Sequence, residues 1–167
     1  MSGKGKTALS LLAAILLPMS GGIAGSVSVA KSFSTWYQVI RKPSWTPPSW
    51  VFGPVWTTLY TLMGIASWLV WRKWSKENKG VSKPAALYGT QLVLNWIWTP
   101  IFFGLHAPGW ALAEIVLMWS TILATMIQFF RTDKRAGAML VPYQIWVSIA
   151  TALNAAVWWL NRPGTTN

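Results

Sequence analysis

The sequence predicts an all-α membrane protein, in which five transmembrane helices form a bundle and a long, partly structured first loop caps a pocket. Three observations lead to this fold class. The chain contains five apolar segments, each about 20 residues long. Only 10% of its 167 residues are charged, against about 25% in typical soluble domains. The segment Lys42 to Tyr60 combines three tryptophans with four prolines, and an apolar run follows it directly.

The expected helices cover about residues 8–30, 51–71, 85–105, 109–130 and 138–160 of a single domain, residues 1–167. At the rise of an α-helix each matches a hydrocarbon core ~30 Å thick. The first segment, with Lys4 and Lys6 before it, also resembles a secretory signal. However, it is long for a signal, and small residues such as Gly21 and Gly25 are typical of close helix packing. We therefore expect a retained helix.

The first loop, residues 31–50, carries the most unusual pattern, continued in KPSWTPPSWVFGPVWTTLY at residues 42–60. Closely spaced prolines fix φ and remove backbone donors, so the first half of this stretch is not a helix interior. Its aromatic content argues against disorder. We expect it to cover the mouth of the bundle, with Trp56 facing a pocket from the first turns of the second helix.

The charge balance, 14 Lys and Arg against 3 Asp and Glu, gives a net charge of +11. The basic residues fall between the apolar segments rather than on one patch, so we expect no nucleic-acid partner. They lie mostly on the side of the N-terminus, which places the N-terminus inside and the first loop outside. The chain has no cysteine, which excludes disulfides, Cys-ligated metals and thiol catalysis.

Motifs of ordinary catalysis are absent, and Gly5-Lys6-Thr7 lacks the context of a phosphate-binding loop. Three polar residues remain open to two interpretations. Glu114 is either a ligand or proton contact or an acid close to the headgroups. Asn95 either contacts a ligand or bonds between helices. His106, the sole histidine, has no nearby partner for a metal or haem iron, and we expect no metal site.

Fourteen tryptophans are a large excess for this length. About half lie at helix ends, where amphipathic rings form interfacial belts. Others lie deeper or beside Pro and Asn: Trp56, Trp96, Trp98, Trp119 and Trp146. Flat π-surfaces that converge in a cavity suit a large, flat, apolar ligand.

Several long motifs resemble the tryptophan-rich sensory protein/translocator protein (TspO/MBR) family, known in animals as the peripheral-type benzodiazepine receptor. They are KPSWTPPSWVFGPVWTTLY at 42–60, LNWIWTPIFFG at 94–104, GWAL at 109–112 and VPYQIW with a following LN at 141–154. The resemblance implies a five-helix membrane protein, usually a homodimer in the lipid bilayer, whose pocket binds porphyrins, related tetrapyrroles and synthetic ligands. It also implies that the first helix is retained.

The resemblance further implies a set of ligand-binding residues. They are Tyr37, Trp56, Asn95, Trp98, Trp110, Trp146, Ala150 and Leu153. No cofactor is obligatory, and porphyrin or haem is expected as a ligand. Some bacterial relatives are reported to degrade protoporphyrin in light, which would give Trp56 and Trp146 a catalytic role. Sterol binding is in doubt, because Ala155 and Ala156 stand where the animal pattern needs a tyrosine.

Three functions remain open: a tetrapyrrole receptor or sensor linked to stress regulation, an oxidative porphyrin-degrading enzyme, and a transporter of porphyrin or sterol. We favour the receptor, because the helices carry no acid–base pair for catalysis and few ionisable residues for coupled transport. The expected location is a bacterial cell-envelope membrane, or the mitochondrial outer membrane if the source is eukaryotic.

Overall fold

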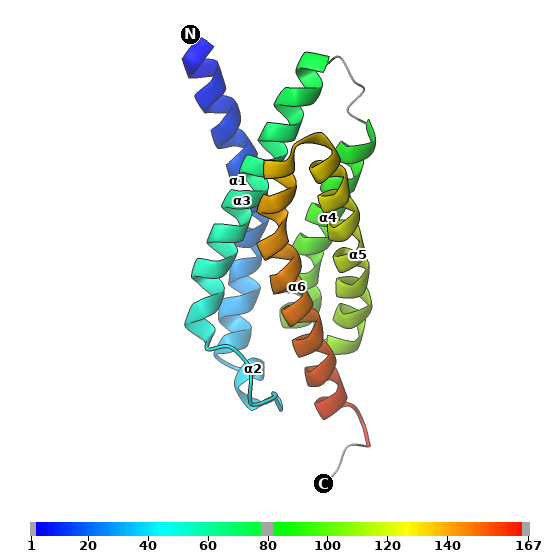
Figure 1. Ribbon diagram of the computed structural model, residues 1–167. Coiled ribbons are helices and arrows are strands. Elements are labelled where there is room, and N and C mark those ends of the chain that lie inside the picture. The colour runs from blue at the N-terminus through cyan, green and yellow to red at the C-terminus, as the bar shows by residue number, and fades with distance from the viewer. Residues whose placement is uncertain (1–2, 78–81, 165–167) are drawn as a thin grey trace.

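Long helices run side by side along one axis in the computed structural model, which describes residues 3–77 and 82–164 (Figure 1). No β-strand occurs among these residues. The helices are α1 (Gly3–Phe33), α2 (Trp36–Val39), α3 (Ser49–Glu77), α4 (Ser82–Thr99), the π-helical segment η1 (Pro100–Gly104), α5 (Pro108–Thr132) and α6 (Lys134–Asn161).

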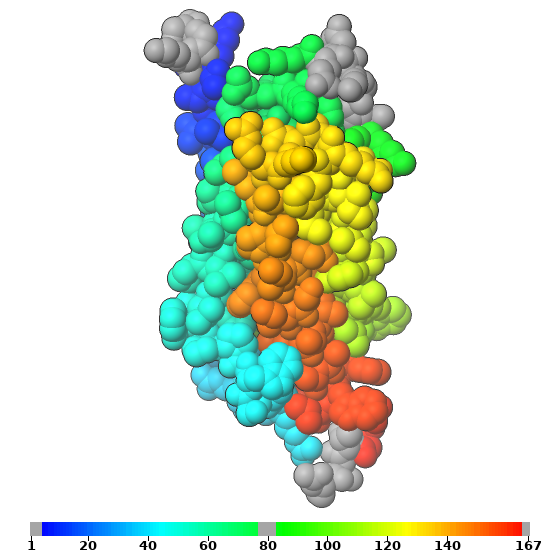
Figure 2. Space-filling model, viewed as in Figure 1, coloured from blue at the N-terminus to red at the C-terminus, as the bar shows by residue number. Residues whose placement is uncertain are grey.

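The all-helical expectation is confirmed, but the number of helices and their bounds differ from it. The described residues form six α-helices rather than five, because the first loop contains the four-residue helix α2. α1 and α3 also extend into the range expected for that loop, which leaves residues 34–48 between them. We refer to residues 34–48 as the lid. They cover the end of the bundle next to the last turns of α6 (Figure 2).

By length and composition, three of the described helices are able to cross a membrane. They are Gly5–Phe33 in α1, Pro108–Thr132 and Lys134–Asn161. The other two long helices are less apolar. Tryptophan, tyrosine and threonine interrupt the aliphatic residues of α3, and Gln91, Asn95 and Lys83 lower the hydropathy of α4. Composition alone therefore supports three of the five expected spans.

The core lies where α3, α4, α5 and α6 meet. Its fully buried side chains include Met63, Val70, Ile122, Tyr143 and Val147. α5 packs mainly against α6 and α4, whereas α1 packs mainly against α3. Gly64 permits this last contact, because a Cβ at that position would lie 2.5 Å from the Cα of Ile15. At Gly21 a Cβ would lie 1.9 Å from the Trp96 ring, so the expected close packing of the α1 glycines is confirmed.

The end of α4 changes its winding. From Pro100 to Gly104 the chain continues as the π-helix η1, with one residue more per turn than an α-helix has. Both Phe102 and Phe103 are buried there, although they are consecutive residues. The π-helical turn thus directs two adjacent rings into the interior.

The α5–α6 turn has its own stabilising contact at the opposite end of the bundle. The Asp133 carboxylate caps α6 by accepting hydrogen bonds from the backbone N–H groups of Arg135 (2.8 Å) and Ala136 (3.4 Å). The side-chain hydrogen bond from Arg135, the two backbone bonds and the charge of Arg135 lower the pKa of this carboxyl. Asp133 therefore fixes the start of α6 in its ionised form.

Candidate functional site

A cavity of about 440 Å³ lies between α1, α3, the α4–η1 junction and α6. Its volume falls within the range of small-molecule sites, about 300–1,000 Å³. α3 contributes Phe52, Trp56 and Tyr60, and α6 contributes Trp146 and Ala150. The α1 wall is formed by side chains such as Met19 and Val29, and its small residues leave room for the cavity. We refer to this space as the main cavity.

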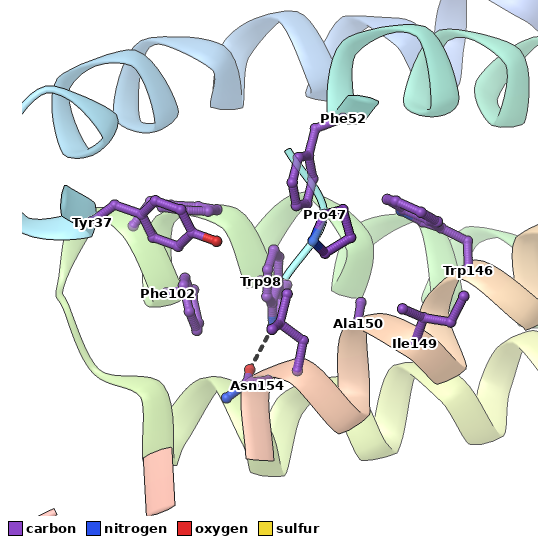
Figure 3. A pocket seen from close by; sticks show the side chains of 11 residues that line it. Tyr37, Pro47, Phe52, Trp98, Phe102, Trp146, Ile149, Ala150 and Asn154 are labelled. Carbon is purple, nitrogen blue, oxygen red and sulfur yellow. Dashed lines mark hydrogen bonds between the residues drawn. The ribbon is translucent and has the colours of Figure 1, made fainter. Parts of the chain in front are cut away.

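A smaller space of about 30 Å³ lies on the lid side (Figure 3). We refer to it as the lid-side compartment. It adjoins the main cavity, since both are lined by Phe52, Phe103, Trp98, Trp146 and Ala150. Its remaining lining residues are Tyr37, Pro47, Phe102, Ile149, Leu153 and Asn154. The two spaces thus form one aromatic site that extends from the bundle interior to the lid.

Aromatic contacts hold the walls of this site in place. The Phe52 and Trp146 rings meet edge to face with centroids 5.8 Å apart, and Trp98 stacks on Phe102 at 5.0 Å. Trp98 also donates a hydrogen bond from Nε1 to Asn154 Oδ1 at 3.1 Å. Because α3, α4, η1 and α6 each supply a ring, the shape of the site depends on the packing of the whole bundle.

A chain of buried hydrogen bonds supports the floor of the main cavity. Tyr60, which lines the cavity, donates its hydroxyl proton to Asn95 Oδ1 at 2.8 Å. Asn95 Nδ2 donates to the Tyr143 hydroxyl, which in turn donates to Gln91 Oε1, both at 3.0 Å. These groups are buried and bonded, so they fix the relative positions of α3, α4 and α6.

Hydrogen bonds and ring contacts attach the lid to the bundle. The Asn161 side chain donates to the carbonyl of Arg41 (2.8 Å) and accepts from its N–H (3.0 Å). The Trp36 ring stacks on His106 with centroids 4.5 Å apart. Tyr37 of the lid is buried, and burial raises the pKa of its hydroxyl. This hydroxyl therefore stays protonated at neutral pH, directed toward the space that the labelled side chains enclose (Figure 3).

Comparison with known proteins assigns the chain to a family. Residues 14–160 match the TspO/MBR family, which covers all the elements that line the site. The chain belongs to the TspO/MBR family. It is 42% identical to the human Translocator protein over 143 residues, which cover 86% of this chain and 85% of the relative. Over 156 residues it is also 42% identical to the Tryptophan-rich protein TspO of Chlorobaculum tepidum, covering 93% and 98%.

A third TspO/MBR relative is the Tryptophan-rich sensory protein of Cereibacter sphaeroides. It is 43% identical over 126 residues, which cover 75% of this chain and 77% of the relative. Family membership and the apolar helices together identify the chain as a membrane protein. The family resemblance seen in the sequence is thereby confirmed.

The structure brings together six of the eight residues expected at a TspO/MBR ligand site. Trp56 lines the main cavity, Tyr37 and Leu153 line the lid-side compartment, and the other three line both spaces. These three are Trp98, Trp146 and Ala150. The six residues together come from four elements, α2, α3, α4 and α6, which are far apart in the sequence.

Two expected residues lie elsewhere. Asn95 is 3% exposed and does not line either space. It contacts the cavity wall indirectly, because its side chain accepts a hydrogen bond from the hydroxyl of the lining residue Tyr60. Trp110 is 78% exposed and lines neither space. The reason lies in the rotation of α5: the next residue, Ala111, is fully buried, and Trp110 projects outward at about 100° from it. Its assignment to the pocket is therefore corrected.

Sequence reasoning missed several wall residues, above all Phe52 and Phe103. Phe52 precedes Trp56 by four residues, which places the two on one helix face, and this spacing was a usable signal. Phe103 had no such signal, because its inward direction depends on the π-helical turn. The α1 wall was missed for another reason: glycines, a serine and aliphatic side chains form most of it, and they carry no chemical signature.

The remaining polar candidates do not form a metal site. Among the described residues, no three His, Asp, Glu or Cys side chains gather to hold a metal ion. His106 is engaged with Trp36. Both carboxyl oxygens of Glu114 are buried and have no hydrogen-bond partner within the described part of the chain. The chemistry of the site is therefore that of aromatic surfaces and a few neutral polar groups.

Proposed function

We propose that this chain is a membrane receptor or sensor that binds porphyrins or related tetrapyrroles in the main cavity. The observation that carries the proposal is the cavity itself. It offers about 440 Å³ and is walled by the rings of Phe52, Trp56, Trp98 and Trp146. A flat conjugated macrocycle gains both apolar burial and ring–ring contact in such a space.

The composition of the wall supports a large apolar ligand over a small polar one. Among the described residues, no charged side chain lines either space, and two of the polar groups at the wall are already bonded, Tyr60 to Asn95 and Trp98 to Asn154. A polar metabolite would lose its hydration in such a site and would gain few new hydrogen bonds in return. An aromatic ring system loses little and gains contact area.

We also propose that five segments cross the membrane: α1, α3, α4 continued by η1, α5 and α6. α4 and η1 together run from residue 82 to 104, about 20 residues or slightly more, which is long enough to span. An odd number of crossings fits Figure 1, in which α1 begins at one end of the bundle and α6 ends at the other. Because the chain has no cysteine, single cysteines at Ser75 and Ser44 should react with a membrane-impermeant maleimide from opposite sides.

The binding proposal is tested by titrating protoporphyrin IX into purified protein in lipid nanodiscs and following the porphyrin absorption band. Empty nanodiscs correct for partition into lipid. Trp56→Ala combined with Trp146→Ala should weaken binding by about tenfold or more, as expected for the loss of two ring contacts. Trp119→Ala is the matched control, because Trp119 bonds to Ser148 and does not line the cavity. Equal affinity in all three proteins would contradict the assignment.

A second function, light-dependent oxidation of porphyrin, is favoured by one observation. The oxidisable indoles of Trp56 and Trp146 both line the cavity, where they would contact a bound photosensitiser. In that reaction porphyrin, light and dioxygen supply the chemistry, and the protein supplies position and electron-rich rings. Illumination of the aerobic complex, with anaerobic and Trp119→Ala samples as controls, decides whether a product forms that depends on both tryptophans.

A further inference from the structure

Basic side chains gather at the lid end of the described structure. Four basic residues lie there: Lys31, Arg41, Lys42 and Arg162. Two of the three acidic residues of the chain, Glu77 and Asp133, lie at the opposite end, at the end of α3 and before α6. The third, Glu114, has no hydrogen-bond or ion-pair partner within the described residues. Among the described residues, the lid end thus carries basic side chains but neither Glu77 nor Asp133.

Lys42 is held against a residue that lines the site. Its Nζ donates hydrogen bonds to the carbonyl oxygens of Tyr37 and Ile40. The same ammonium lies 4.7 Å from the centroid of the Tyr37 ring, and Tyr37 lines the lid-side compartment. One ring therefore separates a fixed, half-buried cation from the lid-side compartment, which adjoins the main cavity.

The position of Lys42 has a chemical consequence. An ammonium group offers three donors, and the two carbonyls use two of them. The carbonyls and the π-face orient Lys42 without neutralising it, since neither carries a full charge. A carboxylate that reaches the lid would complete the set through a charge-assisted hydrogen bond. Inside the cavity the same carboxylate would meet no cation, which is strongly unfavourable.

We propose that Lys42 is the anion subsite of the cavity and that the ligand is a flat apolar ring system with carboxylate groups at one edge. This inference rests on the proposed function and adds the orientation of the ligand. The ring body occupies the aromatic cavity, and the acidic edge points to the lid, where Lys42 binds it. The subsite selects tetrapyrrole acids over neutral flat molecules of the same size.

The test compares protoporphyrin IX with its dimethyl ester, which has the same macrocycle but no carboxylate. Both are titrated into the full chain in nanodiscs of neutral phosphatidylcholine. We expect the wild-type protein to bind the diacid about tenfold more tightly than the diester, in line with one partly exposed charge-assisted bond. Lys42→Gln should abolish this preference, whereas Lys42→Arg should keep most of it.

The control variant is Lys73→Gln. Lys73 also donates to a backbone carbonyl, that of Thr132, but at the opposite end of the bundle. It should leave the preference for the diacid unchanged. The diester serves as an internal control for the lid, because its affinity should not change in Lys42→Gln unless the lid itself is disturbed.

The outcomes separate the two proposals. If neither porphyrin binds, the proposed function fails. If both bind equally to the wild-type protein, or if Lys42→Gln weakens both equally, the cavity binds porphyrin but Lys42 is no anion subsite. Nanodiscs with anionic phosphatidylglycerol add a further arm. If Lys42→Gln alters association with that lipid but leaves the diacid-to-diester ratio intact, the cation serves lipid headgroups and the inference is overturned.

Discussion

Trp98 and Asn154 form the hydrogen bond that joins the aromatic wall of the site to α6. Trp98 Nε1 lies 3.1 Å from Asn154 Oδ1, and Asn154 Nδ2 donates to the carbonyl of Pro108 at 2.7 Å. Asn154 belongs to α6 and is itself 1% exposed. It therefore links α6 both to α4 and to the first residue of α5. A buried amide that satisfies two partners in this way contributes both stability and the direction of the Trp98 ring.

Replacement of this amide should destabilise the bundle. Asn154→Ala leaves the Trp98 N–H and the Pro108 carbonyl without partners, which costs about 2 kcal/mol. Thermal unfolding in a mild detergent, followed by circular dichroism, measures the change. Asn161→Ala is a useful comparison, because Asn161 lies at the exposed end of α6 and bonds to the lid and to its own helix rather than to other helices of the bundle. An unchanged melting temperature for Asn154→Ala would argue against the link.

The buried network under the main cavity should be sensitive to the loss of a single hydroxyl. Tyr143→Phe removes the group that accepts from Asn95 and donates to Gln91, with an expected cost of about 1–3 kcal/mol. Tyr88→Phe is the matched control, since the Tyr88 hydroxyl makes a long 3.5 Å contact with the Met63 carbonyl. We expect a smaller change there, and equal changes in the two variants would contradict the network.

The contact between α1 and α3 should not tolerate even one methyl group. Gly64→Ala places a Cβ 2.5 Å from the Ile15 backbone, so the helices have to separate, at a cost of about 1–3 kcal/mol. Gly89→Ala, in α4, has open space within 4 Å and should stabilise the helix by up to about 1 kcal/mol. Unfolding measurements on the two variants should show a lower free energy of unfolding for Gly64→Ala and a higher one for Gly89→Ala.

Asp133 should give the α5–α6 turn a dependence on pH. Because the pKa of this carboxyl is lower in the folded protein, its contribution is fully present above the unfolded value of about 3.9. It is lost as the pH falls through the lower, folded pKa. Asp133→Ala should cost about 1 kcal/mol at pH 7, whereas Asp133→Asn should keep part of the cap. A cost that is the same at pH 7 and pH 3 would contradict the role of the ionised form.

Trp110 should be dispensable for binding in the cavity. The ring is 78% exposed, so Trp110→Ala should change the affinity for protoporphyrin less than twofold. Trp98→Ala should weaken it by about tenfold, because Trp98 lines both spaces of the site. Absorption titrations of both variants, corrected for empty nanodiscs, make the comparison. A strong effect of Trp110→Ala would show that the ligand reaches the outer side of α5.

The sequence predicted the helices well, because runs of apolar residues of this length have few alternatives. It predicted Trp56, Trp98 and Trp146 through motifs specific enough to identify the family. It did not predict helix α2, whose four residues are held by contacts with other elements rather than by their own propensity. For example, Tyr37 lies 5.5 Å from the Phe103 ring, measured between centroids.

The error at Trp110 has a similar cause. A motif identifies a residue but does not give the rotation of its helix, and on α5 a difference of one position separates the buried Ala111 from the exposed Trp110. The α1 wall illustrates the opposite problem. Its glycines matter through the space that they leave, and only the arrangement of the neighbouring helices shows how that space is used.

The π-helical turn at Pro100–Gly104 also determines what the loss of one residue from this segment would do to the site. A π-helical turn contains one residue more than an α-helical turn, so deletion of one residue within it would let ordinary winding close the gap. Successive side chains would then be separated by about 100° around the helix axis, a wider angle than in the π-helical turn, and one of the two rings would leave the interior. A natural variant one residue shorter in this segment should therefore have a wider and less aromatic site, even if every tryptophan were retained.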